Sequence, residues 1–232
     1  MLMRPDVEII AWLMEGDPAV RWQTMRDLLD AQREAYESER LRISTHGWGA
    51  RILARQEDSG LWAGGLYTPK WTSTTYTMLL LRRFGLDPQN AQARKACRLL
   101  LNEGVYPDGG INYFASLKHS ETCVTGMVLS ILACFRYRDD RIGNLVEHLL
   151  SQQMNDGGWN CQTYRGATHS SFHTTISVLE GLREFDKSSE TETTHVIHAH
   201  RRGCEVLLAH QLFLSHRTGK VVDPKMTRLS FP

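Results

Sequence analysis

The sequence has no excess of either charge, since 27 Lys and Arg stand against 26 Asp and Glu and the formal net charge is +1. No block of like charge is long enough to attract nucleic acid or a membrane surface, so neither partner is expected. No apolar run approaches the ~18 residues of a membrane span. The apolar stretch from Val7 to Met14 contains Glu8 and lacks a basic leader and a cleavage site, so no signal peptide is predicted.

Cysteine is also scarce and scattered. The five cysteines lie at positions 97, 123, 134, 161 and 204, an odd number without the spacing of a secreted disulfide framework. We therefore expect a soluble, cytoplasmic protein. With 232 residues and 41% hydrophobic content, the chain can bury a substantial core.

What the sequence does contain is a repeat of about fifty residues. Each copy has an amphipathic helix, a turn with glycine and a more apolar helix. Trp62, Ile111 and Trp159 follow the three turns at spacings of 49 and 48 residues. The turns read Asp58-Ser-Gly-Leu-Trp62, Asp108-Gly-Gly-Ile-Asn112 and Asp156-Gly-Gly-Trp-Asn160. Their glycines allow the positive φ that a sharp connection needs.

The second helix of each repeat is apolar on nearly every side, as in the stretches 78–81 and 127–132. A helix of this kind must be buried on every side. Two concentric layers satisfy this requirement, and so does a superhelical solenoid of helix pairs. We predict an all-α fold, an α/α-barrel (toroid) of repeated helical pairs that is incomplete or partly open. The predicted organisation is one domain, with N-terminal helices on the outer layer in 1–44 and repeats in 45–232, divided at about 45–88, 89–140, 141–190 and 191–232, the last incomplete.

Ahead of the repeats, Asp17 and Pro18 form a cap and first-turn pair for a helix that we expect to reach Asp30. Its expected apolar stripe consists of Val20, Met25, Leu28 and Leu29.

The segment from Gln152 to Asn160, Gln-Gln-Met-Asn-Asp-Gly-Gly-Trp-Asn, resembles the glutamine-to-tryptophan repeat of squalene-hopene cyclases. Gln56-Glu-Asp-Ser-Gly-Leu-Trp62 is a second match. The resemblance covers roughly residues 45 to 215 and implies the α/α-toroid superfamily of terpene cyclases and protein prenyltransferase β subunits. In that superfamily the Gln and Trp tie turn to helix, and members include cyclases, prenyltransferase subunits and binding proteins without chemistry.

The protonating Asp-x-Asp-Asp motif of squalene-hopene cyclases is absent. The nearest fragment is Asp139-Asp140, which lies between Arg138 and Arg141. We interpret it as a solvated, salt-bridged loop and not as an acid catalyst. An ordinary squalene-type cyclase is therefore not predicted.

Aligning the apolar helices on Thr74, Thr122 and Thr174 gives Ser73, Glu121 and His173 equivalent positions. The order Glu121-x-Cys123 followed by His173 is similar to the Asp-x-Cys and His of the zinc site in protein prenyltransferase β subunits. The resemblance implies a Zn²⁺ site with one open position, as in catalytic zinc sites. Glu replaces the Asp of that pattern. A polar pocket without metal and simple helix capping remain alternative interpretations.

Further candidates surround this site. The loop before His173 supplies His169, Cys161 and Tyr164, which we regard as candidate catalytic residues. Aromatic and polar residues near the turns could form the walls that an isoprenoid chain requires. These candidate substrate-binding residues are Ser73, Trp71, Tyr76, His119, Tyr113 and Phe172. The same aromatic side chains could instead pack the helix ends.

The leading hypothesis is an enzyme of the prenyltransferase and terpene-cyclase-like group, acting on an isoprenoid or similarly apolar small molecule in a central cavity. The alternative is a non-catalytic toroid that binds a lipid, a peptide or a partner protein. Three complete pairs make an arc instead of a ring. A homodimer, or residues beyond the present C-terminus, would then be needed to complete the layer.

Overall fold

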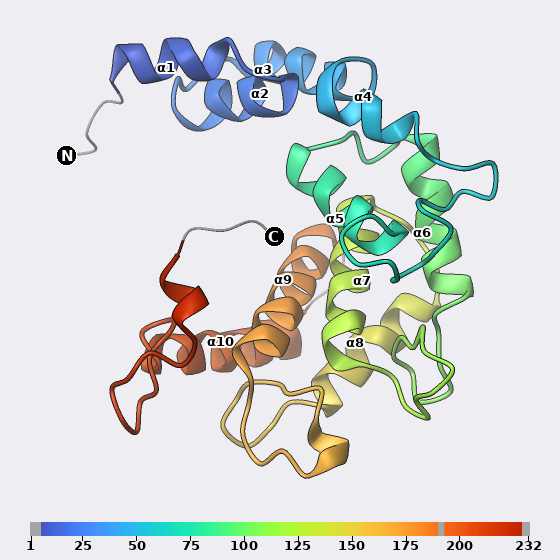
Figure 1. Cartoon of the computed structure of the whole chain (residues 1–232), viewed down its shortest axis with the longest axis vertical. Helices are drawn as coiled ribbons and strands as arrows, with labels where there is room; N and C mark the ends of the chain where they lie inside the picture. Colours follow the sequence, from blue (N-terminus) through green and yellow to red (C-terminus); the bar gives the residue numbers. More distant parts are fainter. Residues whose placement is uncertain (1–5, 190–192, 229–232) are drawn as a thin grey trace. The chain divides into compact units, whose positions relative to one another are not determined.

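The computed structural model describes residues 6–189 and 193–228, so the outermost residues of both chain ends and the first residues of the predicted 191–232 repeat lie outside the described part. Helices supply the regular structure of these residues, beside a few isolated β-bridges (Figure 1). The prediction of an all-α protein is therefore confirmed. The α-helices are α1 (Val7–Met14), α2 (Pro18–Asp27), α3 (Arg33–Leu41), α4 (Gly47–Leu53), α5 (Thr74–Phe84), α6 (Ala91–Asn102), α7 (Thr122–Cys134), α8 (Arg141–Ser151), α9 (Phe172–Ser188) and α10 (Thr194–Ala209), with 3-10 turns η1 (Arg42–Ser44), η2 (Thr163–Arg165) and η3 (Pro224–Thr227).

The chain divides into two compact units. We call residues 1–103 with 134–137 unit 1, and residues 104–133 with 138–232 unit 2. The division falls inside the second repeat and not at a boundary between repeats.

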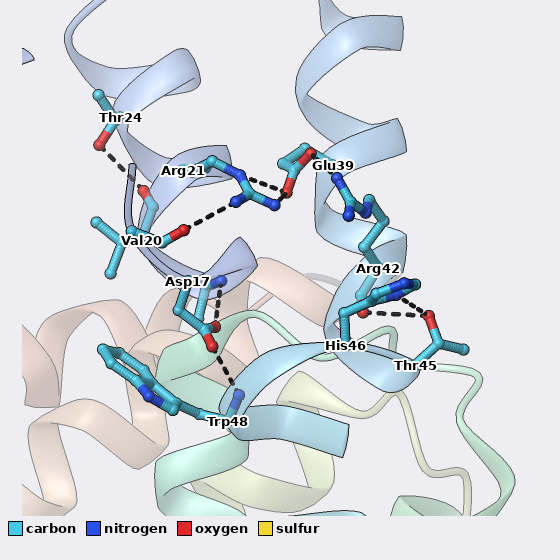
Figure 2. A network of polar contacts seen from close by, with 11 residues as sticks. Asp17, Val20, Arg21, Thr24, Glu39, Arg42, Thr45, His46 and Trp48 are labelled. Carbon is cyan, nitrogen blue, oxygen red and sulfur yellow. Dashed lines mark hydrogen bonds and ion pairs between the residues drawn. The ribbon is translucent and has the colours of Figure 1, made fainter. Parts of the chain in front are cut away.

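In unit 1, a single carboxylate caps two helices. Asp17 accepts a hydrogen bond from the backbone N–H of Ala19 at 2.9 Å, at the start of α2, and another from Trp48 at 2.6 Å, at the start of α4 (Figure 2). Arg21 and Glu39 form an ion pair between α2 and α3 in the same region. The cap predicted from Asp17 and Pro18 is confirmed, and it also joins two helices that are far apart in the sequence.

The apolar stripe predicted for α2 is wrong. The helix ends at Asp27, and Leu28 and Leu29 are exposed. The largest buried side chain of α2 is Trp22, whose indole N–H donates to the carbonyl of Phe84 at 2.7 Å. Tryptophan has the larger apolar surface and a donor that finds a buried acceptor, so it and not the leucines faces the rest of unit 1.

We call the first helix of each repeat (α4, α6, α8 and α10) the outer helix and the second (α5, α7 and α9) the inner helix, by their order in the repeat. Burial separates α6 from α7 as the sequence predicts, whereas Leu79 and Leu80 of α5 are only partly buried. The outer helix α6 buries one stripe, at Ala93, Ala96, Cys97, Leu100 and Leu101. The spacing of this stripe is that of an amphipathic helix. Ten residues of α7 are buried, from Thr122 to Ala133, which fits a helix that is apolar nearly all round. The inner helix α9 is less enclosed, since Ile176 is 46% exposed.

The glutamine and tryptophan of the repeat tie turn to helix with the same bonds in two copies. Gln56 Nε2 donates to the carbonyls of Gly60 at 2.9 Å and Gln92 at 3.1 Å. Gln153 Nε2 donates to Gly157 at 2.7 Å and Ala199 at 2.8 Å. In both copies the second acceptor lies on the next outer helix, so each glutamine connects one repeat to the following one. The tryptophan bonds are equally alike, from Trp62 to Ile52 at 2.8 Å and from Trp159 to Leu149 at 2.7 Å.

A threonine of each inner helix satisfies the backbone N–H that follows the turn. The threonine hydroxyl accepts this bond in all three copies, at 2.9 to 3.1 Å. The sequence separation between the bonded residues grows from 12 to 14 to 16 along the three copies. The three pairs are Trp62 and Thr74, Ile111 and Thr125, and Trp159 and Thr175.

The inner helices of unit 2 approach each other closely. A Cβ on Gly126 would lie 2.7 Å from the carbonyl oxygen of Ser177, and a Cβ on Gly181 would lie 2.6 Å from that of Gly126. Glycine at both positions therefore lets the backbones of α7 and α9 touch. Around this crossing lies the hydrophobic core of unit 2, which includes the fully buried Trp159 and extends to α10.

Across the described ranges 6–189 and 193–228, no helix has both the length and the apolar character needed to cross a membrane.

Candidate functional site

Several candidate residues lie at or beside the starts of α5, in unit 1, and of α7 and α9, in unit 2. Ser73 and Ser171 are the capping residues before α5 and α9, and Glu121 directly precedes α7. Glu121 N–H donates to Ile111 at 2.9 Å and Ser171 N–H donates to Trp159 at 2.9 Å. These matching bonds make Glu121 equivalent to Ser171, and hence Cys123 equivalent to His173.

This register corrects the alignment made from the threonines, which paired Glu121 with His173. The third inner helix begins two residues earlier than Thr174, at Phe172. The cause is the hydroxyl of Ser171, which accepts a hydrogen bond from the N–H of Thr174 at 3.2 Å and caps the helix there.

A pair of cysteine thiols lies at this place in unit 2. Cys123 is the second residue of α7, and Cys161 lies in the long loop before α9. The two thiols are close enough for each to change the pKa of the other. The backbone N–H of Cys161 donates to the hydroxyl of Thr174 at 3.2 Å, which holds the loop against the first turn of α9.

The two thiols have opposite electrostatic environments. The hydrogen bond from Cys123 lowers the pKa of Cys161 to about 6, helped by the Thr174 hydroxyl and the nearby His173, while burial opposes the change. The pKa of Cys123 is raised, first by its hydrogen bond to Cys161, then by burial and by the negative charges of Cys161 and Glu121. Of the two thiols, Cys161 therefore has the environment that favours the thiolate, and Cys123 the one that favours the protonated form.

Glu121, Cys123 and His173 do not form a metal-binding cluster in this arrangement. Within the part of the chain that the structure describes, no group of three or more His, Cys, Asp or Glu side chains is placed to hold a metal ion. The zinc site that the resemblance implies is not confirmed and stays a prediction. What the structure brings together at these helix starts is the thiol pair, with Glu121 and His173 acting on it through their charges.

A cavity of about 360 Å³ adjoins Cys161. Its lining includes His119 and Tyr164, whose rings are 4.1 Å apart between centroids. The Nε2 atom of His119 is buried and has no hydrogen-bond partner among the described residues. A polar atom of this kind can accept or donate one more bond, to water or to a ligand.

No model of a known protein family matches the chain, and no curated protein matches it. The function of the chain must therefore be inferred from the geometry of the candidate site and from the repeat.

A larger cavity of about 860 Å³ is lined by three predicted candidates, Phe172 and His173 at the start of α9 and His169 in the preceding loop. Phe172 and His173 come from the first turn of α9. The Phe172 ring meets the edge of the His210 ring at 5.0 Å. Val222 and Met226 add apolar surface. This volume is within the range of small-molecule sites.

Two histidines of this cavity were not predicted as site residues. His210 Nδ1 donates to the carbonyl of Leu214 at 2.7 Å, so its Nε2 accepts the bond from His216 Nδ1 at 2.9 Å. The tautomers follow from this chain of bonds. Both residues follow the third repeat, so no equivalent residue in another repeat could indicate their role.

His148 was also missed. Its Nδ1 donates to the carbonyl of Asp108 at 2.9 Å, and its Nε2 pairs with the Ser120 hydroxyl at 3.1 Å, in the lining of the smaller cavity. The available signal was a histidine on the buried face of α8, between Leu145 and Leu149.

The remaining candidates lie elsewhere. Tyr113 lines neither of the two cavities described above. In unit 1, Trp71 and Tyr76 have ring centroids 5.0 Å apart and form an aromatic cluster before α5. The neighbouring Ser73 is fully buried, and its hydroxyl has no hydrogen-bond partner among the described residues. The predicted salt bridge near Asp140 is confirmed, since Asp139 pairs with Arg141 at 2.7 Å.

Proposed function

We propose that this chain is an α/α-toroid protein of the terpene cyclase and protein prenyltransferase group, an enzyme that acts on an apolar, isoprenoid-like substrate with Cys161 as its reacting group. The toroid and the family rest on the resemblance of the Gln-to-Trp segments. They are supported by the equal bonds of Gln56 and Gln153.

The observation that carries the proposed chemistry is the position of Cys161, which lines the smaller cavity and is held by its N–H against Thr174 at the start of α9. A cysteine thiolate is a strong nucleophile, and the lowered pKa of Cys161 favours this form. An allylic carbon bearing a diphosphate is a suitable electrophile. The sulfur lone pair would form the C–S bond while the electron pair of the broken C–O bond leaves with the diphosphate.

The larger cavity would hold the apolar chain. His173 lines this cavity and also acts on the charge of Cys161, so the two features are adjacent. Phe172, Val222 and Met226 give the cavity apolar walls, and its volume of about 860 Å³ is sufficient for a ligand of this class.

A test of the proposal uses farnesyl diphosphate as the probe. We expect the wild-type protein to release diphosphate, with either a product in solution or a farnesyl adduct on Cys161 by mass spectrometry. Cys161→Ser should bind the probe without releasing diphosphate. Cys204→Ser removes another half-buried cysteine and serves as the matched control. Equal diphosphate release by wild type and Cys161→Ser would contradict the assigned role.

The second candidate function is a toroid that binds an apolar ligand without chemistry. One observation favours it: Cys161 lies outside the lining of the larger cavity, so a ligand could occupy that cavity without meeting the thiolate. Saturable binding of farnesyl diphosphate with no diphosphate release from any variant would support this function.

Zinc at Glu121, Cys123 and His173 is retained as a separate prediction. Metal analysis of the purified protein, with Cys123→Ala and His173→Ala, tests it directly. Stoichiometric zinc that is lost in both variants is the expected result if the resemblance extends to the metal site.

A further inference from the structure

Ser120 and His148 form a hydroxyl–imidazole pair that the proposed function does not use. The Ser120 Oγ lies 3.1 Å from His148 Nε2. On the other side of the ring, Nδ1 lies 2.9 Å from the carbonyl oxygen of Asp108, which can only accept a hydrogen bond. In the neutral imidazole, Nδ1 therefore carries the proton and Nε2 is the acceptor for the serine hydroxyl. This is the tautomer that can take a proton from serine.

Asp108 fixes both members of the pair. Its backbone carbonyl orients His148, and its carboxylate Oδ2 accepts the N–H of Ser120 at 2.8 Å. Gly110 leaves the space that the pair occupies, because a Cβ there would lie 2.3 Å from the Ser120 Oγ and 2.8 Å from His148 Nε2. One turn therefore holds the serine, the histidine and the carbonyl that orients the histidine, which are the parts of a nucleophile–base arrangement.

The other two repeats show what histidine adds at this position. Where His148 approaches the turn of the second repeat, Lys95 approaches that of the first and Arg202 that of the third. Both donate to carbonyls of their turns, as His148 does. A structural bond to the turn thus needs only a donor, which lysine and arginine supply without a nitrogen that could accept a proton. Histidine adds this acceptor, and a serine hydroxyl lies within its reach.

Ser170 is the counterpart of Ser120 in the third repeat. Its N–H donates to the carboxylate of Asp156 at 2.7 Å, as that of Ser120 does to Asp108. Each hydroxyl is also close to the carboxylate of its own turn. In the part of the chain that the structure describes, however, no histidine is bonded to the Ser170 hydroxyl. The histidine is therefore what distinguishes Ser120 from a serine with the same backbone contacts.

The pair lines the cavity of about 360 Å³, so a small molecule in this cavity can reach it. Thr122, which begins α7, lines the same cavity. The first N–H groups of a helix have no acceptor within the helix and favour negative charge, so they can stabilise an oxyanion. The wall also contains the buried Nε2 of His119, which has no partner among the described residues and can bind a further polar atom.

We infer that Ser120 and His148 form a catalytic dyad that hydrolyses small carboxylic esters through an acyl-serine intermediate. The activity is separate from the proposed action on isoprenoids, because neither Cys161 nor the larger cavity takes part in it.

The reaction has two acyl-transfer steps. The Ser120 Oγ attacks the ester carbonyl carbon while its proton passes to His148 Nε2. The C–O bond to the alcohol then breaks, and the alcohol oxygen takes the proton from Nε2. In the second step, a water molecule gives a proton to Nε2 and attacks the acyl carbon, the bond to Oγ breaks, and Oγ recovers the proton. One ester and one water thus give one carboxylic acid and one alcohol.

The experiment exposes the full chain to p-nitrophenyl acetate and, separately, to a fluorophosphonate, which forms a P–O bond with an activated serine and releases fluoride. We expect p-nitrophenolate release above the uncatalysed rate and a phosphonyl adduct that peptide mass spectrometry places on Ser120. Ser120→Ala should lose the adduct and hydrolyse the ester at least about tenfold more slowly. Ser170→Ala, the matched control, should keep both the adduct and the rate.

His148→Gln separates the base from the structural bond. Glutamine can donate to the Asp108 carbonyl but cannot take up a proton at neutral pH, so this variant should fold and yet lose the adduct and the hydrolysis. Circular dichroism checks the fold of each variant, and the position of the adduct on the wild type decides even where a variant does not fold. The inference is overturned if the wild type is not labelled on Ser120, if a folded Ser120→Ala or His148→Gln variant hydrolyses at the wild-type rate, or if the acetyl group is found on Cys161 instead.

Discussion

Gln153 joins the end of α8 to α10, since its side-chain amide donates to the carbonyl of Ala199 at 2.8 Å as well as to that of Gly157 at 2.7 Å. One side chain thereby satisfies two backbone acceptors that belong to different helical pairs. The contribution of this residue to folding is larger than that of an ordinary surface glutamine, because its loss removes a hydrogen bond from each of the two carbonyls.

Gln153→Ala should lower the free energy of unfolding by about 1 to 3 kcal/mol. Urea denaturation followed by circular dichroism measures the change. Gln56→Ala, which removes the same pair of bonds in the first repeat, should have a similar cost. Gln162→Ala is the control, because Gln162 is exposed. Equal stability of Gln153→Ala and Gln162→Ala would show that the bonds are not structural.

The glycines at the crossing of α7 and α9 should tolerate no side chain. Gly181→Ala places a methyl group 2.6 Å from the Gly126 carbonyl oxygen, and Gly126→Ala meets Ser177 in the same way. Each should destabilise the protein by about 1 to 3 kcal/mol. Gly143→Ala is a matched control in α8, where nothing lies within 4 Å of the new Cβ. That change should stabilise by up to ~1 kcal/mol, because alanine is the better helix former.

Asp17→Ala should weaken two helix starts at once. The loss of the bonds to Ala19 and Trp48 should cost about 1 to 2 kcal/mol, the upper range for an N-cap. Asp6→Ala removes a cap of the same type from α1, which has no buried residues, and should cost much less. Thermal unfolding of both variants measures the difference. Similar effects of the two changes would mean that the Trp48 bond adds nothing.

The turn carboxylates should make stability depend on acid pH. Burial alone would raise the pKa of Asp108 and Asp156, but backbone N–H groups of Ser120 and Gly110, and of Ser170 and Gly158, donate to them and lower it overall. A lowered folded-state pKa stabilises the fold above the ordinary value of about 4, and this contribution is lost as pH falls through the folded pKa. Asp156→Asn should therefore be less stable than wild type at pH 7, with a smaller difference at pH 3. Urea midpoints across this range check the prediction, which fails if the two curves stay parallel.

Alkylation should reveal the thiolate of Cys161. Because its pKa is lowered to about 6, its rate of reaction with iodoacetamide should stay high from pH 8 to about 6 and then fall tenfold per pH unit. Cys204, whose pKa is raised by burial, should still become faster above pH 8. Peptide-resolved mass spectrometry follows both sites in one sample. A Cys161 profile that parallels Cys204 would contradict the assigned environment.

The repeat could be predicted because its bonds are made by residues at fixed spacing. Gln153, Gly157 and Trp159 lie within one turn, so their order in the sequence already contains their geometry. The start of α9 could not be predicted in the same way. Threonines occur at 122 and 125 and at 174 and 175, and the choice between them depends on the Ser171 hydroxyl and on the length of the loop.

The proximity of Cys123 and Cys161 was also beyond the sequence, because α8 and the loops on both sides of it separate the two residues, and no sequence pattern predicts the path of those loops. The buried pair of His148 and Ser120 depends on α8 packing against the earlier segment that leads into α7. Local sequence patterns therefore predict the structure of each turn, whereas tertiary packing determines which side chains of different repeats meet.

The threonine hydroxyls that accept the hydrogen bond from the N–H after each turn allow loops of different length in this protein. The intervening segments differ in length by up to four residues, from 12 to 16, yet each ends on the same bond. Because this bond fixes the end of each loop on its helix, extra residues around η2 (orange in Figure 1) need not disturb the helices. Insertions, epitope tags or grafted binding loops placed near Gly166, where added side chains meet open space, should be accommodated there before anywhere else in the third repeat.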